Sequence, residues 1–548
     1  MKKVHYILFA FICFSFSIIV SIYLRQSVHS EGVGIVSVWP PVIFGIDFQK
    51  DEFIYSQEME ELVFNIGFIK IKLKSFFPYL TLTIFGKEIM ISWVFYYTPF
   101  LTYYISEPLR RFKLIPESIA LTFISMVILY FFSSLKLASV LFQNFIRKEI
   151  TKLFFLLFII FSPSFYSLIL QFHHLQSAIF LNLFIAFLLE GRYKISSIFG
   201  GLALYSYAPS IHLVLGAYIT QIIRTKNLKA VLLSSIISLS FLIPYIIHIK
   251  LAEKMADHYQ KVCKDCIFYN AYTELYNFFG QKVEGFSLDK IIPKIFQGLS
   301  QTLSSCCFVK EAFVKLKSSF SLSDIYLGYG FISQKSDLHF ISDTANTIVL
   351  AITLIFGIIF FTKSFEVIFI IVSLFLFLLL DVIIPAVPKM LYTILPVFSC
   401  LFVKVLFKIE NFAKDLWVIL VLAMLLRISD VYKISDYYLP YFKEKETKDV
   451  VNFVLQNKLE NEIYVFSMPI AFWYYSGAKA NPPLVLLAYH RGEKEDKLKI
   501  IRFLLRKTKY VLIDARFEDM FKESARYEGI DMNILFKNQA YMVISSEK

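Results

Sequence analysis

Long apolar runs recur along this chain of 548 residues, and they constrain its fold more than any other feature. A stretch of about 18 or more apolar residues with few charges is long enough to cross a bilayer as a helix. Hydrophobic residues make up 57% of the chain and the mean hydropathy is +0.61, whereas soluble domains contain roughly 45–50% apolar residues. The sequence therefore predicts an α-helical polytopic membrane protein.

The basic residues set the predicted orientation. A formal net charge of +13 would suggest nucleic acid in a soluble protein, but the lysines and arginines here lie largely in short loops between apolar runs. Such loops face the cytoplasm by the positive-inside rule. Lys2 and Lys3 precede an apolar run over 6–24 that has no small-residue cleavage site. We therefore expect an uncleaved first helix and a cytoplasmic N-terminus.

About eleven transmembrane helices result when the basic loops stay on the cytoplasmic side. The run 89–105 contains Pro99 and several tyrosines, and counting it as a span would invert every later basic loop. We expect it to lie in the membrane interface as an amphipathic helix. After the first helix, spans are predicted over 117–135, 153–171, 175–189, 195–207, 210–223, 230–249, 344–361, 366–384, 391–407 and 416–428. Pro209 breaks the pair 195–207 and 210–223.

The remaining segments are predicted on the outer side. The membrane module covers 1–428 and has two long extracytoplasmic loops, 25–116 and 250–343. The segment 429–548 mixes helical and strand-like patterns, which predicts a small extracytoplasmic α/β domain. Its expected helices cover 447–459 and 496–506, and its expected strands cover 463–466, 510–513 and 541–544.

Four of the six cysteines lie in the second long loop. They are Cys263, Cys266, Cys306 and Cys307, whereas Cys13 and Cys400 lie in apolar segments. Two disulfides can form in an extracytoplasmic loop. The spacing of Cys263 and Cys266 also fits a metal site, but outside the cytoplasm disulfides are the favoured interpretation.

The predicted spans contain few ionisable residues, whereas transporters usually carry carboxylates, histidines or arginines near the bilayer midplane. Polar residues gather instead at the outer ends of the helices, which indicates a site at the outer leaflet. The strongest candidates are the acidic residues of the first outer loop, Asp47, Asp51 and Glu52. His173 and His174 lie at the outer end of a predicted span. Adjacent histidines point to different helix faces, so they make a poor metal pair but could contact a substrate.

The segment 39–55 around these acids resembles the acidic motif of the GT-C superfamily of polyprenyl-phosphate-dependent glycosyltransferases. This group includes protein O-mannosyltransferases and the aminoarabinose transferases that modify lipid A. In that family an Asp-Glu pair followed by an aromatic residue lies just past the first helix. Asp51-Glu52 with Tyr55 looks like this motif.

Shorter resemblances follow along the chain. Residues 77–79 with Gly86-Lys87, Pro99 and Arg110 or Arg111 are similar to the juxtamembrane stretch of the family. Residues 201–209 look like a helix break of bacterial relatives. Near the last spans, Lys389 stands where the family usually has an arginine.

The resemblance implies an inverting glycosyltransferase of the plasma (inner) membrane. It would transfer a sugar from a polyprenyl-phosphate donor to an extracytoplasmic lipid, glycan or protein, with membrane lipids and no nucleic acid as partners. Asp51 would take the proton of the acceptor hydroxyl, with Glu52 as its partner and Asp47 in reserve. Lys87, Arg110, Arg111 and Lys389 would bind the lipid phosphate. No metal ligands are assigned, and the use of a divalent metal is left open.

Other interpretations fit the same residues. Asp51 and Glu52 also suit a solvated acidic turn, and Arg110 and Arg111 suit interfacial anchors. A flippase or polysaccharide polymerase for lipid-linked glycans would share the composition, and a membrane-depth cavity lined by Arg or His would favour it. A catalytically inactive assembly subunit would be favoured if Asp51 and Glu52 faced bulk water.

Overall fold

The computed structural model forms two compact units, which are described separately: 1–27, 122–245 and 278–437 in unit 1, and 28–121, 246–277 and 438–548 in unit 2. The structure describes residues 62–66, 69–73, 80–84, 87–91, 101, 105, 115–143, 148–170, 172–225, 227–243, 293, 313–314, 316–317, 337–381, 394–429, 444–459, 462–465, 498, 501–502, 505–506 and 509–547.

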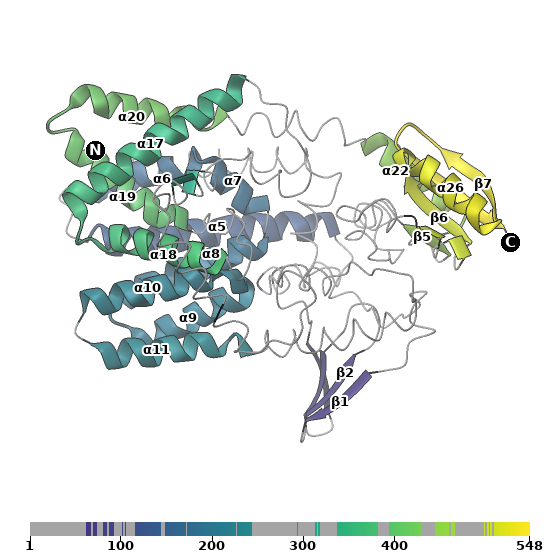
Figure 1. The fold of residues 1–548 in the computed structure, drawn as a ribbon, viewed down its shortest axis with the longest axis horizontal. Helices are drawn as coiled ribbons and strands as arrows, with labels where there is room; N and C mark the ends of the chain where they lie inside the picture. The colour runs from purple at the N-terminus through teal and green to yellow at the C-terminus, as the bar shows by residue number, and fades with distance from the viewer. Residues whose placement is uncertain are drawn as a thin grey trace. The chain divides into compact units, whose positions relative to one another are not determined.

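Unit 1 is a bundle of apolar helices (Figure 1). They are α5 (Ile115–Leu141, of which 122–141 belong to unit 1), α6 (Lys148–Ile160), α7 (Pro163–Leu170), α8 (Phe172–Leu189), α9 (Tyr193–Ser206), α10 (Ile211–Arg224), α11 (Leu228–Ser240), α17 (Asp337–Phe361), α18 (Phe365–Asp381), α19 (Leu395–Ile409) and α20 (Lys414–Leu426). Every span predicted after residue 117 overlaps one of them. The predicted span 153–171 is divided between α6 and α7, because Pro163 starts a new helix and favours an extended residue before it.

Two helices among the described residues are long and apolar enough to cross a membrane by themselves. They are Ile124–Leu141, with a mean hydropathy of 1.9, and Ile341–Phe361, with 2.2. Shorter apolar helices accompany them, at Ile150–Ile160, His174–Leu189, Ile211–Arg224, Leu228–Ser240 and Phe365–Leu379. The number of eleven spans stays a prediction, as does the first helix over 6–24, which lies outside the described residues.

Unit 1 is apolar outside and partly polar inside. Leu233 on α11, Ile359 on α17 and Leu422 on α20 are more than half exposed, while many serines, together with Asn182 and Thr353, are buried. Water-soluble domains place such residues the other way round. Apolar surroundings require polar groups to pair inside the helix bundle. These helices therefore fit a membrane protein.

Four helix connections meet at one end of unit 1, which we call the basic end and define as 190–192, 225–227, 362–364 and 410–413 (Figure 1). Their proximity follows from contacts: the Lys408 ammonium lies 5.6 Å from the Phe360 ring, and the Arg224 guanidinium lies 5.8 Å from the Phe365 ring. Exposed basic side chains surround this end, namely Arg192, Lys194, Arg224, Lys229, Lys363, Lys408 and Lys414. Four of the loops predicted to be cytoplasmic thus share one end.

Small residues bring α9 close to α11 in unit 1. A Cβ built on Gly200 would lie 2.6 Å from Ser238 Oγ. That hydroxyl donates to the carbonyl oxygen of Ser197 at 2.8 Å and also lies 2.8 Å from the Tyr218 hydroxyl. Close backbone approach through small residues is a common way to join helices in membranes.

Gly200→Ala is therefore expected to destabilise unit 1 by about 1–3 kcal/mol, since the added methyl group displaces a hydroxyl that holds two hydrogen bonds. Thermal unfolding of the purified protein in detergent measures the effect. Gly357→Ala is the matched control, because the nearest atoms to its Cβ would belong to the flexible side chain of Leu401, the first of them at 3.2 Å. Equal shifts for both variants would contradict the packing role of Gly200.

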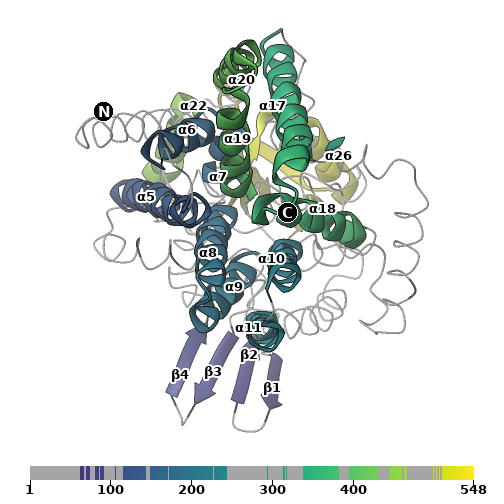
Figure 2. The same ribbon diagram turned by 90° about the vertical axis from the view of Figure 1, so that its left-hand side faces the viewer.

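A four-stranded antiparallel sheet lies in the first long loop, in unit 2 (Figure 2). Its strands are β1 (Leu62–Ile66), β2 (Ile69–Leu73), β3 (Leu80–Ile84) and β4 (Lys87–Ile91), paired in chain order. The amphipathic helix predicted over 89–105 is wrong at its start, because Ile89–Ile91 belong to β4. Alternating residues in β2 and β3 favour strands there.

The C-terminal part of unit 2 is an α/β domain, as predicted. Its sheet has the order β5-β6-β8-β7, with β5 and β6 parallel and the other pairs antiparallel. The strands are β5 (Ile463–Val465), β6 (Tyr510–Asp514), β7 (Asp531–Lys537) and β8 (Tyr541–Glu547), and the helices are α22 (Glu444–Gln456) and α26 (Glu518–Glu528). The three predicted strands and the first predicted helix are found, whereas β7 and α26 were not expected.

The alternation of side chains along β8 explains why helices pack on both faces of this sheet. Met542 and Ile544 join the core formed with Phe521 of α26, while Tyr541 contacts Thr447 of α22. A β-bulge between Ile534 and Phe536 changes the face of β7. Phe536 consequently packs on Phe453 of α22, with ring centroids 4.9 Å apart.

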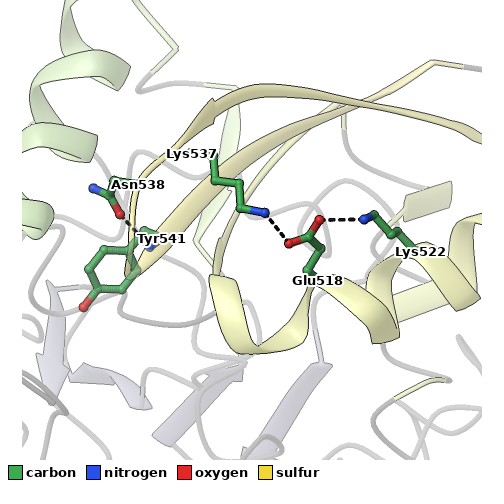
Figure 3. A network of polar contacts seen from close by, with 5 residues as sticks. All are labelled: Glu518, Lys522, Lys537, Asn538 and Tyr541. Atoms are coloured by element: carbon green, nitrogen blue, oxygen red, sulfur yellow. Dashed lines mark hydrogen bonds and ion pairs between the residues drawn. The ribbon is translucent and has the colours of Figure 1, made fainter.

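Polar contacts hold the β7–β8 hairpin and the start of α26 (Figure 3). Asn538 Oδ1 accepts from the backbone N–H of Tyr541 at 2.7 Å and closes the turn. Glu518 accepts from Lys522 and Lys537, each at 2.6 Å. Hydrogen bonds from these ammonium groups, that of Lys522 first, hold the pKa of the Glu518 carboxyl below its ordinary value of 4.5.

This lowered pKa predicts an acid-sensitive contact. A carboxyl whose pKa is lower in the folded state stabilises the fold above pH 4.5, and the contribution is lost as the pH falls through the lowered value. Hydrogen exchange of the 518–547 region should lose protection over that acidic window in the wild type. The Glu518→Gln variant should lack this step, whereas Asp519→Asn, a change in the same turn, should retain it. A step that persists in Glu518→Gln would assign the acid sensitivity to another group.

Candidate substrate-binding end of the helical unit

Most of the residues predicted to form the site lie outside the described residues. These are Asp47, Asp51, Glu52, Tyr55, Arg110, Arg111 and Lys389. The four cysteines predicted to form disulfides, Cys263, Cys266, Cys306 and Cys307, also lie outside the described residues, as does Cys13. Their proposed roles stay predictions. Lys87 is placed by its backbone as the first residue of β4, opposite Ile84 of β3, and His173 as the second residue of α8.

His174 is the one predicted site residue whose side chain the structure describes. It lies in the first turn of α8 and is 1% exposed. Its ring packs edge-on against Tyr207, the residue that follows α9, with a centroid distance of 4.2 Å. Its predicted contact with substrate is untested by this packing.

His174 belongs to a group of buried polar residues that we call the helix-break cluster: His174, Gln176, Ser177, Ser206, Tyr207, Ser210 and His212. The cluster surrounds the interruption between α9 and α10, where a 3-10 turn, Ala208–Ser210, replaces the α-helix. Pro209 has no N–H to continue a helix, which explains the predicted and observed break.

Hydrogen bonds connect the cluster across the helices. Gln176 Nε2 donates to Ser206 Oγ at 2.6 Å, and the hydroxyls of Ser177 and Ser210 lie 2.8 Å apart. His212 Nδ1 lies 2.6 Å from the carbonyl oxygen of Pro209. The start of α8, the end of α9 and the start of α10 are thereby joined.

A second polar group surrounds Arg427, the residue after α20. Arg427 is 1% exposed, and its guanidinium donates to Asn346 Oδ1 at 2.6 Å and to Ser162 Oγ at 2.7 Å. The same group lies 4.3 Å from the centre of the Phe158 ring. A buried cation requires such hydrogen bonds and aromatic contacts. It joins the end of α6 and the early part of α17 to the end of α20.

Both polar groups lie away from the basic end. The basic end contains the end of α8 and the starts of α9 and α11, whereas the helix-break cluster contains the start of α8 and the end of α9. Arg427 likewise lies at the end of α20, and the basic end holds its start. We call the end that contains the helix-break cluster and Arg427 the polar end. In the predicted topology it faces the outer leaflet.

Few charged side chains are buried in the described part of unit 1. They are Arg427 and Glu366, and Glu366 pairs with Lys404 through Oε1 and Nζ 2.5 Å apart. No row of buried charges crosses these described helices. Among the described residues, no three His, Cys, Asp or Glu side chains gather as metal ligands.

Sequence analysis did not single out His212 or Arg427. The available signals were an arginine that ends an otherwise apolar run, 416–428, and a histidine three residues after Pro209. Neither signal identifies its partners, because Arg427 reaches Ser162 across 265 residues of sequence.

The described residues define a mostly helical chain with apolar helices that fit a membrane protein, joined to a small α/β domain. No protein-family model matches the sequence, and no curated protein matches it. Among solved structures, the chain is similar to ArnT from Cupriavidus metallidurans, at 9% sequence identity. The apo structure gives a TM-score of 0.43 over 98% of this chain and 97% of that chain. The structure bound to undecaprenyl phosphate gives 0.41 over 100% and 98%. Likeness of this extent assigns no activity.

Proposed function

We propose that this chain is a membrane glycosyltransferase of the GT-C type. It transfers a sugar from a polyprenyl-phosphate donor to an extracytoplasmic acceptor, with inversion at the anomeric carbon. The observation that carries the proposal is the pair of buried polar groups at the polar end of unit 1, the helix-break cluster and the surroundings of Arg427. The predicted topology puts this end at the outer leaflet, and exposed basic side chains surround the other end.

The reaction defines which groups the proposed site requires. The acceptor hydroxyl must lose a proton as it attacks the anomeric carbon, and the polyprenyl phosphate must leave with negative charge. A carboxylate takes the proton, and we assign this role to Asp51, with Glu52 beside it and Asp47 as the alternative. Lysine and arginine side chains stabilise the leaving phosphate, and the candidates are Lys87, Arg110, Arg111 and Lys389.

The described buried charges also support the proposal of an enzyme over that of a coupled transporter. Transport coupled to protons or ions usually uses ionisable groups placed along the membrane path. The two buried charges described here, Glu366 and Arg427, are each held by specific partners. This arrangement favours chemistry at one end of the helices over passage through them.

The test uses the purified protein in liposomes with a panel of polyprenyl-phosphate sugars and an extract of envelope lipids and glycans as acceptors. We expect release of polyprenyl phosphate and a product of inverted anomeric configuration from at least one donor. Movement of a fluorescent lipid-linked sugar between leaflets without transfer would identify a flippase instead. The absence of both activities with every donor tested would favour an assembly subunit.

A further inference from the structure

The His212 side chain has a defined hydrogen-bonding orientation in the helix-break cluster. It is the second residue of α10 and is 2% exposed. The carbonyl oxygen of Pro209, 2.6 Å from Nδ1, can only accept a hydrogen bond. Nδ1 therefore carries the hydrogen, and the tautomer of the neutral ring is fixed with a lone pair on Nε2.

Nε2 is buried and has no hydrogen-bond partner among the residues that the structure describes. A buried acceptor left unsatisfied destabilises a fold, and most buried polar atoms in proteins have a partner. Protonation of Nε2 would bury a positive charge, and the helix-break cluster contains no carboxylate that would compensate that charge. Nε2 therefore requires a hydrogen-bond donor from outside the described protein groups.

The described neighbours of the ring are an aromatic side chain and two hydroxyls. Phe377 of α18 packs beside it with ring centroids 5.2 Å apart. The nearby hydroxyls of Ser177 and Ser210 already bond each other. Small-molecule sites usually have mostly apolar walls with a few fixed polar groups that orient the ligand. The Phe377 ring and the oriented Nε2 acceptor are groups of these two kinds.

The chemistry of Nε2 selects among the parts of a lipid-linked sugar. The phosphate oxygens of a polyprenyl phosphodiester carry no hydrogen at neutral pH and cannot donate to a neutral Nε2. Sugar hydroxyls can donate, whether they belong to the donor sugar or to an acceptor glycan. The group recognised at His212 is therefore a hydroxyl and not the phosphate.

We propose that His212 is a binding residue whose Nε2 accepts a hydrogen bond from a sugar hydroxyl at the polar end of the helices. The inference deepens the proposed function and rests on it, because it names a contact of the same substrate class. It assigns no proton transfer to His212.

Two substitutions distinguish the roles of the two ring nitrogens of His212. In His212→Asn the amide nitrogen takes the place of Nδ1 and retains the bond to Pro209, but the Nε2 acceptor is lost. In His212→Gln the amide reaches the place of Nε2 and retains an acceptor there, but the Nδ1 bond is lost. A binding role predicts that the Asn variant loses substrate affinity and that the Gln variant retains more of it. A purely structural role predicts that only thermal stability changes, and that the Gln variant is less stable than the Asn variant.

The experiment measures ligand-induced stabilisation in detergent and, separately, the KM for transfer. The ligands are polyprenyl phosphate without sugar, polyprenyl-phosphate sugars and free acceptor sugars. His212→Asn is expected to bind the sugar-bearing ligand about 2- to 12-fold more weakly, the value of one neutral hydrogen bond, and to bind polyprenyl phosphate as the wild type does. A loss confined to the free acceptor sugar would assign the contact to the acceptor hydroxyl.

Equal stabilisation of wild type and His212→Asn by every sugar-bearing ligand would overturn the inference and leave a bound water or another group of the chain as the partner of Nε2. A wild type that binds sugar-bearing lipids through His212 but transfers nothing would contradict the proposed function alone. The absence of any stabilisation of the wild type by sugar-bearing ligands would overturn the inference as well.

Discussion

Asp51→Asn is expected to lower the rate of sugar transfer by about 10²- to 10⁴-fold, the usual contribution of a positioned general base. Asparagine keeps the size of the side chain but cannot take up the proton of the acceptor hydroxyl. Binding of the donor lipid should change little, because the phosphate is assigned to basic residues. Initial rates at saturating donor, with equal amounts of folded protein in liposomes, measure the effect.

The controls for this prediction use the other carboxylates. Asp47→Asn should retain most of the activity if Asp51 is the base, and a larger loss in Asp47→Asn than in Asp51→Asn would exchange the two roles. Asp531→Asn, an exposed change in β7, provides the matched control far along the chain. Undiminished transfer by both Asp51→Asn and Asp47→Asn would reject the acidic segment 39–55 as the site.

Glu366→Ala is expected to destabilise unit 1 by about 3–5 kcal/mol, because it removes one partner of a buried ion pair and leaves the other charge without compensation. Glu366 is 1% exposed and Lys404 is 12% exposed, at a separation of 2.5 Å. The Lys404 ammonium also lies 6.0 Å from the Phe142 ring, a contact too weak to replace the carboxylate. The apparent midpoint of thermal unfolding in detergent should fall clearly.

Two comparisons make this second prediction specific. Replacing Glu366 and Lys404 together by leucine should restore most of the stability, since apolar residues often substitute for a buried pair without loss. Glu190→Ala breaks the more exposed pair with Lys136 and should change stability by at most about 1 kcal/mol. If Glu190→Ala and Glu366→Ala proved equally destabilising, burial would not determine the strength of these pairs.

The helices could be predicted because their signals are local. Apolar runs ended by basic residues or proline mark the ends of α8, α9 and α10, and Pro209 marks the break between the last two. Pro163 gives the same signal for the division between α6 and α7, but the run 153–171 is also long enough for a single span. The alternation in β2 and β3 is a local strand signal that was not used, whereas β4 overlaps the predicted helix 89–105, where the apolar run alone does not separate strand from helix.

The candidate site could be predicted only in part, for a different physical reason. The acidic segment has a residue pattern of its own, whereas His212 and Arg427 acquire their significance from partners that folding brings to them. Asn346 is 81 residues before Arg427 in the sequence, and Phe377 is far from His212 along the chain. The composition of the sequence and the spacing of its residues do not predict such long-range pairs.

The β-bulge in β7 affects how the edge of this sheet can meet a second copy of the chain. β7 is an edge of the described sheet, with Ile534 and Leu535 both about two-fifths exposed, at 43% and 41%. An irregular strand bounded by Asp531 and Lys537 is a poor template for another strand. The bulge thus opposes aggregation between neighbouring copies while turning Phe536 inward.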